Sequence, residues 1–496
     1  MTNNLTPSGE EVLEQLDINP SNLPTDFPTR EQRLQYRAVV QWITDYKPNS
    51  DATNLEKVQG YLEAFHHLGN VEDWERAREI LFIRLDTPTN ESLPDQLLTW
   101  GYYREPAQHL TRLIGKLNQN CDVICWNGVG VASYSLGEYS HAIDCYQKSL
   151  IIARTLGDRQ EEGKTLGNLG LVYDSLGKYD LAINFYQQYL VIAQDISDRQ
   201  GEGNALGNLG TAYFSLGEYD QAIELHQQHL AIARNIGDRQ GEGNALGNLG
   251  NAYFSLGEYE QAIEFHQQYL TISQAIGDRQ GEGKALGNLG LSYRSVGEYT
   301  KAIEFHQQYL TITRSIGDLQ GEGMALGNVG NVYFSLGEYE QAIEFHQQYL
   351  TIARSIGDQH GEGMALSNLG NSFYSLKDYH QAIDFYKQHL SIARKIGDQH
   401  GKGAALGNLG FTLIEAEQYS EALEYLQEAL ETLRKIGYRS AEAVTLYNLA
   451  ELHQKLGHRD RALKYCHQAL VIFTKLGIPQ VKQCQELKEK LLSQQT

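Results

Sequence analysis

The sequence is poor in cysteine and in long apolar runs. It contains 5 cysteines, an odd and small number for 496 residues, which argues against a disulfide framework and for a reducing compartment. No apolar run approaches the roughly 18 residues that a membrane-spanning helix needs. The first 30 residues have neither the basic segment nor the apolar core of a signal peptide. These absences predict a cytoplasmic protein without membrane insertion.

Positive charge is also scarce. Lysine and arginine number 41 against 62 aspartates and glutamates, which gives a formal net charge of −21. This is the wrong sign for a protein that binds nucleic-acid phosphates or an anionic membrane surface. We therefore expect no nucleic-acid partner. The hydrophobic content of 41% is ordinary and excludes a wholly disordered or collagen-like chain.

What the sequence does have is a repeat of 40 residues. Residues 247–276 read GNLGNAYFSLGEYEQAIEFHQQYLTISQAI, and residues 327–356 match them at 25 of 30 positions. The same register runs from Trp126 to Ala450 and gives nine copies. A fixed period of this length is typical of a solenoid and excludes several independent globular domains.

Each copy has the pattern of two helices. Leu246, Leu249, Gly250 and Tyr253 recur at helical spacing, and Gly257 then offers the left-handed residue that ends a helix. A second helix follows, with one broad face formed by Tyr259, Ala262, Ile263, His266, Tyr269, Leu270 and Ile272.

The second helix is expected to end at Gly277, with Asp278 as the N-cap of the next helix. No segment alternates with period two for long enough to be a strand. A helical hairpin of this size cannot bury its apolar face alone, so the hairpins must stack on one another. The sequence therefore predicts an all-α solenoid.

The spacing of small and aromatic residues resembles the tetratricopeptide repeat. The motif is carried here by Leu249, Gly250, Tyr253, Gly257, Tyr259 and Ala262. The 40-residue period is similar to that of the long-repeat subgroup of LGN/Pins spindle-orientation scaffolds and, more distantly, of kinesin light chain. The near-identical, Gln-rich copies also resemble large bacterial arrays, particularly cyanobacterial ones. The resemblance implies a right-handed α-solenoid whose first helices line a concave groove.

The ends of the chain depart from the repeat. Residues 1–50 contain five of the nine prolines and are expected to be a partly disordered arm, with short helices near 9–17 and 29–46, the former loosely attached. Residues 51–120 resemble two divergent helical pairs of the same kind. The nine repeats span 121–476. Residues 477–496 are expected to hold a capping helix from Val481 to Leu492.

A row of asparagines is the first candidate site. On a helical wheel these residues lie opposite the apolar core, and the resemblance places them in the groove. The row, with one extra amide in three repeats, comprises Asn168, Asn208, Asn248, Asn288, Asn328, Asn368, Asn408, Asn448, Asn251, Asn331 and Asn371. One interpretation is a ladder of amides that holds an extended peptide. The other is a structural role, in which the amides bond a neighbouring helix or were copied by duplication.

A more variable column flanks the asparagines. It comprises Tyr134, Asp174, Phe214, Phe254, Arg294, Phe334 and Tyr374. Aromatic rings around an arginine are the usual components of a binding hot spot, but rings can equally pack against the adjacent first helix. Lys164 and Lys284 add positive charge at the start of the asparagine stripe and favour a partner with an acidic or carboxylate group.

Other motifs predict no chemistry. The glycines of the Gly241–Gly247 segment lack a preceding strand and the GxGxxG spacing, and they favour close helix crossing over phosphate binding. His226, His266, His306 and His346 recur once per repeat, too far apart to share a zinc ion, and are expected to pack in the core. Cys121 and Cys125 lack further ligands. Glutamates such as Glu258 are expected on a solvated face.

Two functional interpretations stay open. The first is a non-enzymatic scaffold whose groove binds peptide segments of partner proteins. The second is a sensor or regulatory subunit of a bacterial signalling system whose effector is encoded separately. The sequence shows no catalytic constellation, so we expect no enzymatic activity, no cofactor and no bound metal. It indicates neither the identity of the partner nor the oligomeric state.

Overall fold

The computed structural model describes residues 5–49, 51–87 and 90–493, and these residues form helices joined by short turns. This part of the chain holds no strand, and an isolated β-bridge pairs Arg84 with Ser92. The predicted all-α fold is confirmed. Residues 1–4, 50, 88–89 and 494–496 lie outside the described part, so the predicted segments 1–50 and 477–496 are described only in part.

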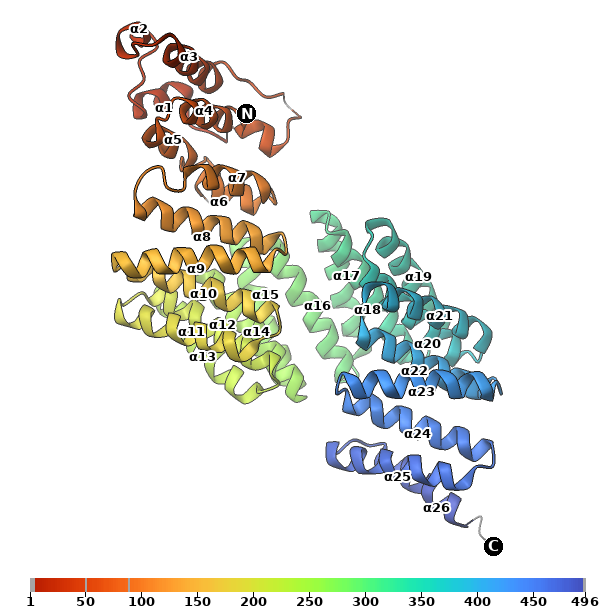
Figure 1. Cartoon of the computed structure of the whole chain (residues 1–496). Coiled ribbons are helices and arrows are strands. Elements are labelled where there is room, and N and C mark those ends of the chain that lie inside the picture. Colours follow the sequence, from red (N-terminus) through yellow and green to blue (C-terminus); the bar gives the residue numbers. More distant parts are fainter. Residues whose placement is uncertain (1–4, 50, 88–89, 494–496) are drawn as a thin grey trace. The chain divides into compact units, whose positions relative to one another are not determined.

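The chain forms two compact units, Met1–Ala245 and Leu246–Thr496, with the boundary inside α14 (Arg239–Leu256). The first unit begins with short and medium-length helices that precede the repeats (Figure 1). They are α1 (Gly9–Gln15), α2 (Leu23–Asp26), α3 (Arg30–Thr44), α4 (Asn54–Asn70), α5 (Trp74–Leu81), α6 (Leu93–Thr99) and α7 (Arg104–Leu113).

The helix α1 is packed, contrary to the loose attachment expected for residues 9–17. Val12 and Leu13 are 1% and 4% exposed and belong to the same core as Val39 and Phe65. A capping box fixes the start of the helix, because the Ser8 Oγ accepts a hydrogen bond from the backbone N–H of Glu11 and the Glu11 carboxylate accepts one from Ser8. The apolar side chains on one face outweigh the effect of the surrounding prolines.

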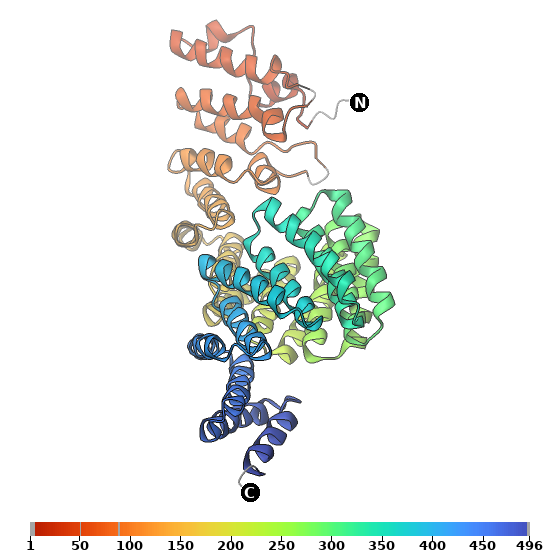
Figure 2. The same ribbon diagram turned by 90° about the vertical axis from the view of Figure 1, so that its right-hand side faces the viewer.

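The remaining helices of the first unit are pairs of nearly equal length. They are α8 (Gln119–Ser135) with α9 (Tyr139–Leu156), α10 (Arg159–Ser175) with α11 (Tyr179–Asp195), and α12 (Arg199–Ser215) with α13 (Tyr219–Ile236). The two helices of a pair pack side by side, and the second helix also packs against the next first helix (Figure 2).

The second unit continues the same arrangement. Its helices after α14 are α15 (Tyr259–Ile276), α16 (Arg279–Ser295), α17 (Tyr299–Ile316), α18 (Leu319–Leu336), α19 (Tyr339–Ile356), α20 (Gln359–Ser375), α21 (Tyr379–Ile396), α22 (Gln399–Glu415), α23 (Tyr419–Lys435), α24 (Arg439–Lys455), α25 (Arg459–Leu476) and α26 (Val481–Ser493). The pairs and their stacking are those of an α-solenoid.

The turns between helices are made as the sequence predicts. Gly257 and Gly277 have positive φ angles of 82° and 71°, a region that glycine enters without steric cost. Asp278 is the N-cap of α16, and its Oδ1 accepts a hydrogen bond of 2.8 Å from the backbone N–H of Gly281. The helices therefore begin at the same position in successive repeats and end within one residue of each other.

Aromatic rings packed against glycines join the two helices of a pair. His226, His266, His306 and His346 are at most 1% exposed, and each ring lies against the glycine that is 16 positions earlier on the first helix. A Cβ atom at Gly330 would be 2.6 Å from the Cε1 of His346. Tyr146, Tyr186 and Tyr386 occupy the equivalent position in other repeats. The histidines are therefore core residues, as expected.

The last helix covers the end of the second unit. Cys484, Leu487 and Leu491 of α26 are buried, and α26 packs on α25. Cys466 of α25 faces Cys484 with 3.4 Å between the two sulfur atoms, and all five cysteines of the chain are buried free thiols.

Candidate functional site

The asparagine row lies on the first helices, and most of its members are half-buried. Asn168, Asn208, Asn248, Asn288, Asn328, Asn368 and Asn408 share this degree of exposure, whereas Asn448 is 7% exposed. The three extra amides lie three residues after an asparagine of the row. Asn251 is exposed, and Asn331 and Asn371 are half-buried. Along most of the row the amides are therefore partly accessible to solvent.

Some of these amides are used within the fold. The Nδ2 of Asn168 donates a hydrogen bond of 2.8 Å to the Oδ1 of Asn127 on the neighbouring first helix. Asn288 donates in the same way to Asn251, at 3.0 Å. The Oδ1 of Asn371 accepts a hydrogen bond of 2.7 Å from the hydroxyl of Tyr386. At these places the amides link helices, which is the structural interpretation.

The rings of the flanking column are half-buried and pack within their own repeat. Each lies beside the tyrosine that begins the second helix of its pair. The ring centroids are 5.3–5.8 Å apart in the pairs Tyr134–Tyr139, Phe214–Tyr219, Phe254–Tyr259, Phe334–Tyr339 and Tyr374–Tyr379. Tyr374 also contacts Phe411 on the next first helix, at 5.4 Å. The column therefore combines packing with partly exposed aromatic surface.

The two charged members of the column are partly buried. Burial lowers the pKa of Arg294, and its charge adds to burial in lowering the pKa of the neighbouring His306. Burial raises the pKa of the Asp174 carboxyl, whose Oδ1 has no hydrogen-bond partner in the described part of the chain. The charge of Arg294 is thus less available to a partner than the sequence suggests.

One exposed position of the first helix changes character along the chain. It is occupied in turn by Lys164, Asn204, Asn244, Lys284, Met324, Met364, Ala404 and Val444, all exposed. Lys164 forms an ion pair of 2.7 Å with Glu161, whereas Lys284 is in no ion pair among the described residues. Met324 and Met364 are each 48% exposed. This apolar stretch forms no recognisable motif, and only the alignment of successive repeats at this position reveals it.

Buried glutamates in the first turn of the first helices were also not predicted. Glu162 is 7% exposed and lies 2.8 Å from Arg154 and 2.6 Å from Arg159. Burial alone would raise the pKa of Glu162, but the hydrogen bonds from both guanidinium groups outweigh burial and lower it. Equivalent contacts occur at Glu242 and Glu442. Arg154 belongs to α9, so the ion pair connects one helical pair to the next.

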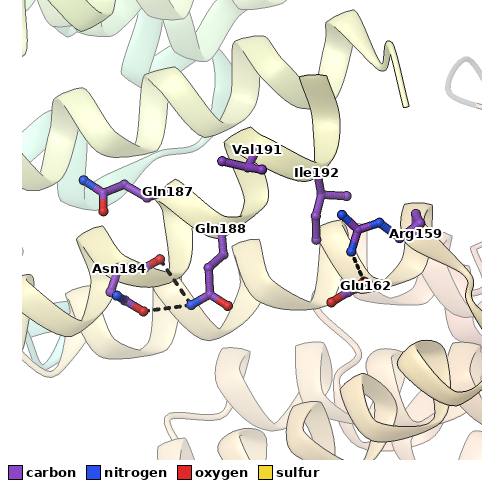
Figure 3. A pocket seen from close by; sticks show the side chains of 7 residues that line it. All are labelled: Arg159, Glu162, Asn184, Gln187, Gln188, Val191 and Ile192. Atoms are coloured by element: carbon purple, nitrogen blue, oxygen red, sulfur yellow. Dashed lines mark hydrogen bonds and ion pairs between the residues drawn. The ribbon is translucent and has the colours of Figure 1, made fainter. Parts of the chain in front are cut away.

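A polar hollow of about 330 Å³ lies beside α10 and α11 (Figure 3). It is lined by Arg159, Glu162, Asn184, Gln187, Gln188, Val191 and Ile192. The Nε2 of Gln188 donates to the Oδ1 of Asn184 at 2.7 Å, and Arg159 pairs with Glu162. Because these polar groups bond one another, the hollow is a weak candidate for a ligand site.

A larger pocket, of about 530 Å³, lies among α20, α21 and α22. Ser367, His389 and Asp398 are among its lining residues. They are not linked as a catalytic triad, because the Nδ1 of His389 has no hydrogen-bond partner and the Oδ1 of Asp398 accepts from the backbone of Gly401. A nucleophile needs a base within hydrogen-bond reach. The pocket therefore offers binding groups without a catalytic arrangement.

Neither a metal cluster nor a membrane span is found in residues 5–49, 51–87 and 90–493. Within these ranges no three His, Cys, Asp or Glu side chains are arranged to hold a metal ion. None of their helices is both long and apolar enough to cross a bilayer.

Profiles of the tetratricopeptide repeat match most of the chain. One matches residues 122–195, 201–275, 244–315, 281–355, 321–395 and 361–435, and a second matches 443–476. No curated protein matches the sequence.

Three solved structures that align with the chain have low sequence identity to it. A signal transduction ATPase with numerous domains from Pyrococcus horikoshii, which has a tetratricopeptide repeat sensor, aligns with a TM-score of 0.53 at 16% identity, over 98% of this chain and 75% of that chain. The apo form of RapI aligns with a TM-score of 0.47 at 16% identity, over 56% and 99%. Repeats of a kinesin light chain from Podosopora anserina give 0.35 at 19% identity, over 39% and 96%. Of the three, only the likeness to the ATPase supports the fold, and it says nothing of function.

Proposed function

We propose, since the chain belongs to the tetratricopeptide repeat family, that it is a non-enzymatic scaffold that binds extended peptide segments of partner proteins along its first helices. The observation that supports this most is the free part of the asparagine row. Asn328, Asn368 and Asn408 are half-buried, and their side chains make no hydrogen bond within the described part of the chain.

An extended segment is the ligand that suits these amides. Each amide has donors and an acceptor, which match the alternating N–H and C=O groups of an extended backbone. Asparagine also costs a few tenths of a kcal/mol relative to alanine in a helix. In Asn288 and Asn168 that cost is offset by a hydrogen bond to the neighbouring helix. In Asn328, Asn368 and Asn408 no side-chain hydrogen bond within the described residues offsets it.

Replacing Asn328, Asn368 and Asn408 together by alanine is expected to weaken peptide binding without loss of stability. Each amide hydrogen bond contributes about 0.5–1.5 kcal/mol, so the three together contribute about 1.5–4.5 kcal/mol. The ligand is obtained by selection from a displayed library of random peptides on the full chain, and its affinity is measured by calorimetry. Stability is expected to rise slightly, because alanine favours helix.

Asn288→Ala is the matched control, because this amide bonds Asn251. We expect this variant to lose stability by about 0.5–1.5 kcal/mol. If the triple variant binds the selected peptide as tightly as the parent chain, or if it loses stability as Asn288→Ala does, the amides are structural and the proposal fails.

The charge of the partner follows from the lysines. Lys164 is neutralised by its ion pair with Glu161. Lys284 is exposed and in no ion pair among the described residues. We therefore propose that an acidic group of the partner binds opposite Lys284 and not opposite Lys164. The five buried thiols support a reducing, cytoplasmic location. The 40-residue period supports membership of the long-repeat subgroup, and the near-identical, Gln-rich copies support a bacterial type of array.

A sensor or regulatory subunit is the alternative. It shares the peptide-binding step, and it differs in that the bound segment belongs to an effector whose activity changes on binding. Measuring the effector's activity with the parent chain and with the triple asparagine variant distinguishes the two, since a passive scaffold leaves that activity unchanged.

A further inference from the structure

The pocket among α20, α21 and α22 departs from most repeats at two positions that face each other, and one of the two replacements, a histidine, is shared with His229 in an earlier repeat. One repeat earlier, Tyr349 packs against Gly327, where a Cβ atom would be 2.8 Å from its ring. The equivalent residues are His389 and Ser367, both of which line the pocket. The smaller imidazole replaces the phenol ring, and about 530 Å³ of space is open here.

Two polar atoms of residues that line this pocket make no hydrogen bond in the described part of the chain. His389 is 7% exposed, and its Nδ1 is buried without a hydrogen bond. An unpartnered buried polar atom carries a free-energy cost that a ligand can remove. The second atom is the Oδ2 of Asp398, which lies 4.0 Å from the Nδ1 of His360, beyond hydrogen-bond distance.

The equivalent aspartate in an earlier repeat shows what is missing at Asp398. The Oδ2 of Asp238 accepts a hydrogen bond of 2.8 Å from Gln200. His360 occupies the position of that glutamine and lies 4.0 Å from the carboxylate, near enough for an ion pair when the ring is protonated but too far for a hydrogen bond. The Oδ1 of Asp398 still caps α22 through the N–H of Gly401, at 2.9 Å. One oxygen of the carboxylate is therefore held by the fold, and the other is available.

The walls of the pocket are apolar and open to solvent. Met364 is 48% exposed, Tyr438 is 46% exposed and Ile396 is 38% exposed, although all three are large apolar side chains. Tyr438 stands where other repeats have the capping aspartate, and its ring lies edge-on to His400 at 5.3 Å. These side chains offer a surface for a methylene chain and a ring face for a cation.

Among the described residues, no lysine or arginine lines the pocket, and Asp398 is the one carboxylate that does. The nearby cations are already bound, because Arg394 and Lys402 both pair with Glu428, each at 2.9 Å. Residues 319–438 contain fifteen aspartates and glutamates against eight lysines and arginines. The charge that complements this pocket is positive.

We propose that this pocket binds the side chain of an arginine or lysine in a segment of a partner protein, with the cationic head on the Oδ2 of Asp398 and the aliphatic stem against Met364 and Tyr438. The proposal deepens the proposed function and rests on it, since it specifies one side chain of the bound segment. The basic residue binds at α20–α22, in repeats different from the one that carries Lys284.

The test uses two blocked amino acids as probes on the full chain: N-acetyl-arginine amide and its citrulline analogue, which has nearly the same shape without the charge. We expect the arginine probe to bind about 10-fold or more tightly, the size of one hydrogen bond to a charged group. In Asp398→Asn the preference should disappear while folding is kept, because asparagine is an equally good N-cap. Asp318→Asn, at the cap of α18, is the control and should leave the preference unchanged.

A second variant fills the pocket with the residues of the preceding repeat. Ser367→Gly with His389→Tyr restores the pair seen at Gly327 and Tyr349, so the chain should fold and lose the arginine probe. Equal binding of arginine and citrulline, no binding of either, or no effect of Asp398→Asn would overturn the proposal. A short alanine peptide with one central arginine must also bind, because binding of the free amino acid alone would exclude a partner's side chain.

The two proposals fail separately. If the parent chain binds arginine no better than citrulline while the selected peptides still bind through the asparagine row, the pocket assignment is refuted and the scaffold function stands. Binding of arginine without any effect of the triple asparagine variant on peptide affinity removes the row and leaves the pocket.

Discussion

Acidification from pH 6.5 to pH 5 is expected to lower the free energy of unfolding steeply, because the histidines packed on glycines are neutral in the folded chain. Burial lowers the pKa of His226, His266 and His346 to about 4 and that of His306 to about 3. The neighbouring charges act in the same direction, since His229 lowers the pKa of His226 and Arg294 lowers that of His306.

The direction of the effect follows from proton binding. An unfolded histidine has a pKa of about 6.5, so below that pH the unfolded chain binds more protons than the folded one. Stability is therefore fully present above pH 6.5 and falls until the folded sites titrate near pH 4. Each histidine contributes about 1.4 kcal/mol per pH unit, and the three in Leu246–Thr496 together contribute about 4 kcal/mol per unit.

Urea denaturation followed by circular dichroism between pH 6.5 and pH 5 measures this slope. The comparison variant replaces His266 and His346 by tyrosine and His306 by phenylalanine. Tyrosine occupies the same position at Tyr386, where its hydroxyl bonds Asn371. In the repeat of His306, the position equivalent to Asn371 is Leu291, which cannot accept a hydrogen bond from a tyrosine hydroxyl. His306 is therefore replaced by phenylalanine. A slope that stays the same in this variant would show that other groups take up the protons.

Replacing Gly250, Gly290 and Gly330 together by alanine is expected to destabilise the second unit, by up to about 6 kcal/mol. In each case the new Cβ atom would lie less than 3.0 Å from an imidazole ring that is itself fully buried. Overpacking costs about 1–3 kcal/mol per site, and at contacts this short it exceeds the 0.8–1.0 kcal/mol or so that alanine gains over glycine in a helix.

Gly407→Ala is the control with the opposite expected sign. It is also in the interior of a first helix, but the nearest heavy atom to its Cβ would be the Oγ1 of Thr445 at 4.0 Å. Here the helix propensity acts alone, and stability should rise by about 1 kcal/mol. Denaturation midpoints that move in the same direction in both variants would contradict the assignment of the glycines to ring contacts.

Much of the fold could be predicted because its signals are local and repeated. Gly277 and Asp278 predict the end of one helix and the start of the next. In the structure Gly277 has the positive φ angle of a helix end, and Asp278 caps the following helix. The capping helix expected from Val481 is α26. In contrast, the attachment of α1 depends on Val12 and Leu13 meeting a core formed by residues far along the chain, which the prolines around it do not reveal.

The candidate site was predicted less completely. The asparagines could be found from their 40-residue period. Whether one of them forms a hydrogen bond within the fold depends on the residue opposite it on the neighbouring helix, as Asn288 bonds Asn251. The ion pairs of Glu162 were missed because Arg154 precedes it on a different helix. The pocket could not be predicted from the repeat pattern, because it arises where the sequence departs from that pattern, at Ser367 and His389.

The interfaces between successive helical pairs are nearly identical, so a whole repeat can be removed without changing the kind of interface. The helix α16 packs on α15 as α18 packs on α17, and the buried residues of the two first helices are almost the same, since Leu286 and Leu289 correspond to Leu326 and Val329. Removal of residues 281–320 would therefore join α15 to an equivalent surface, with every cap still in place. Packing sets the size of one module and leaves the number of modules open, so such a chain can gain or lose whole modules by recombination between near-identical segments without loss of its core.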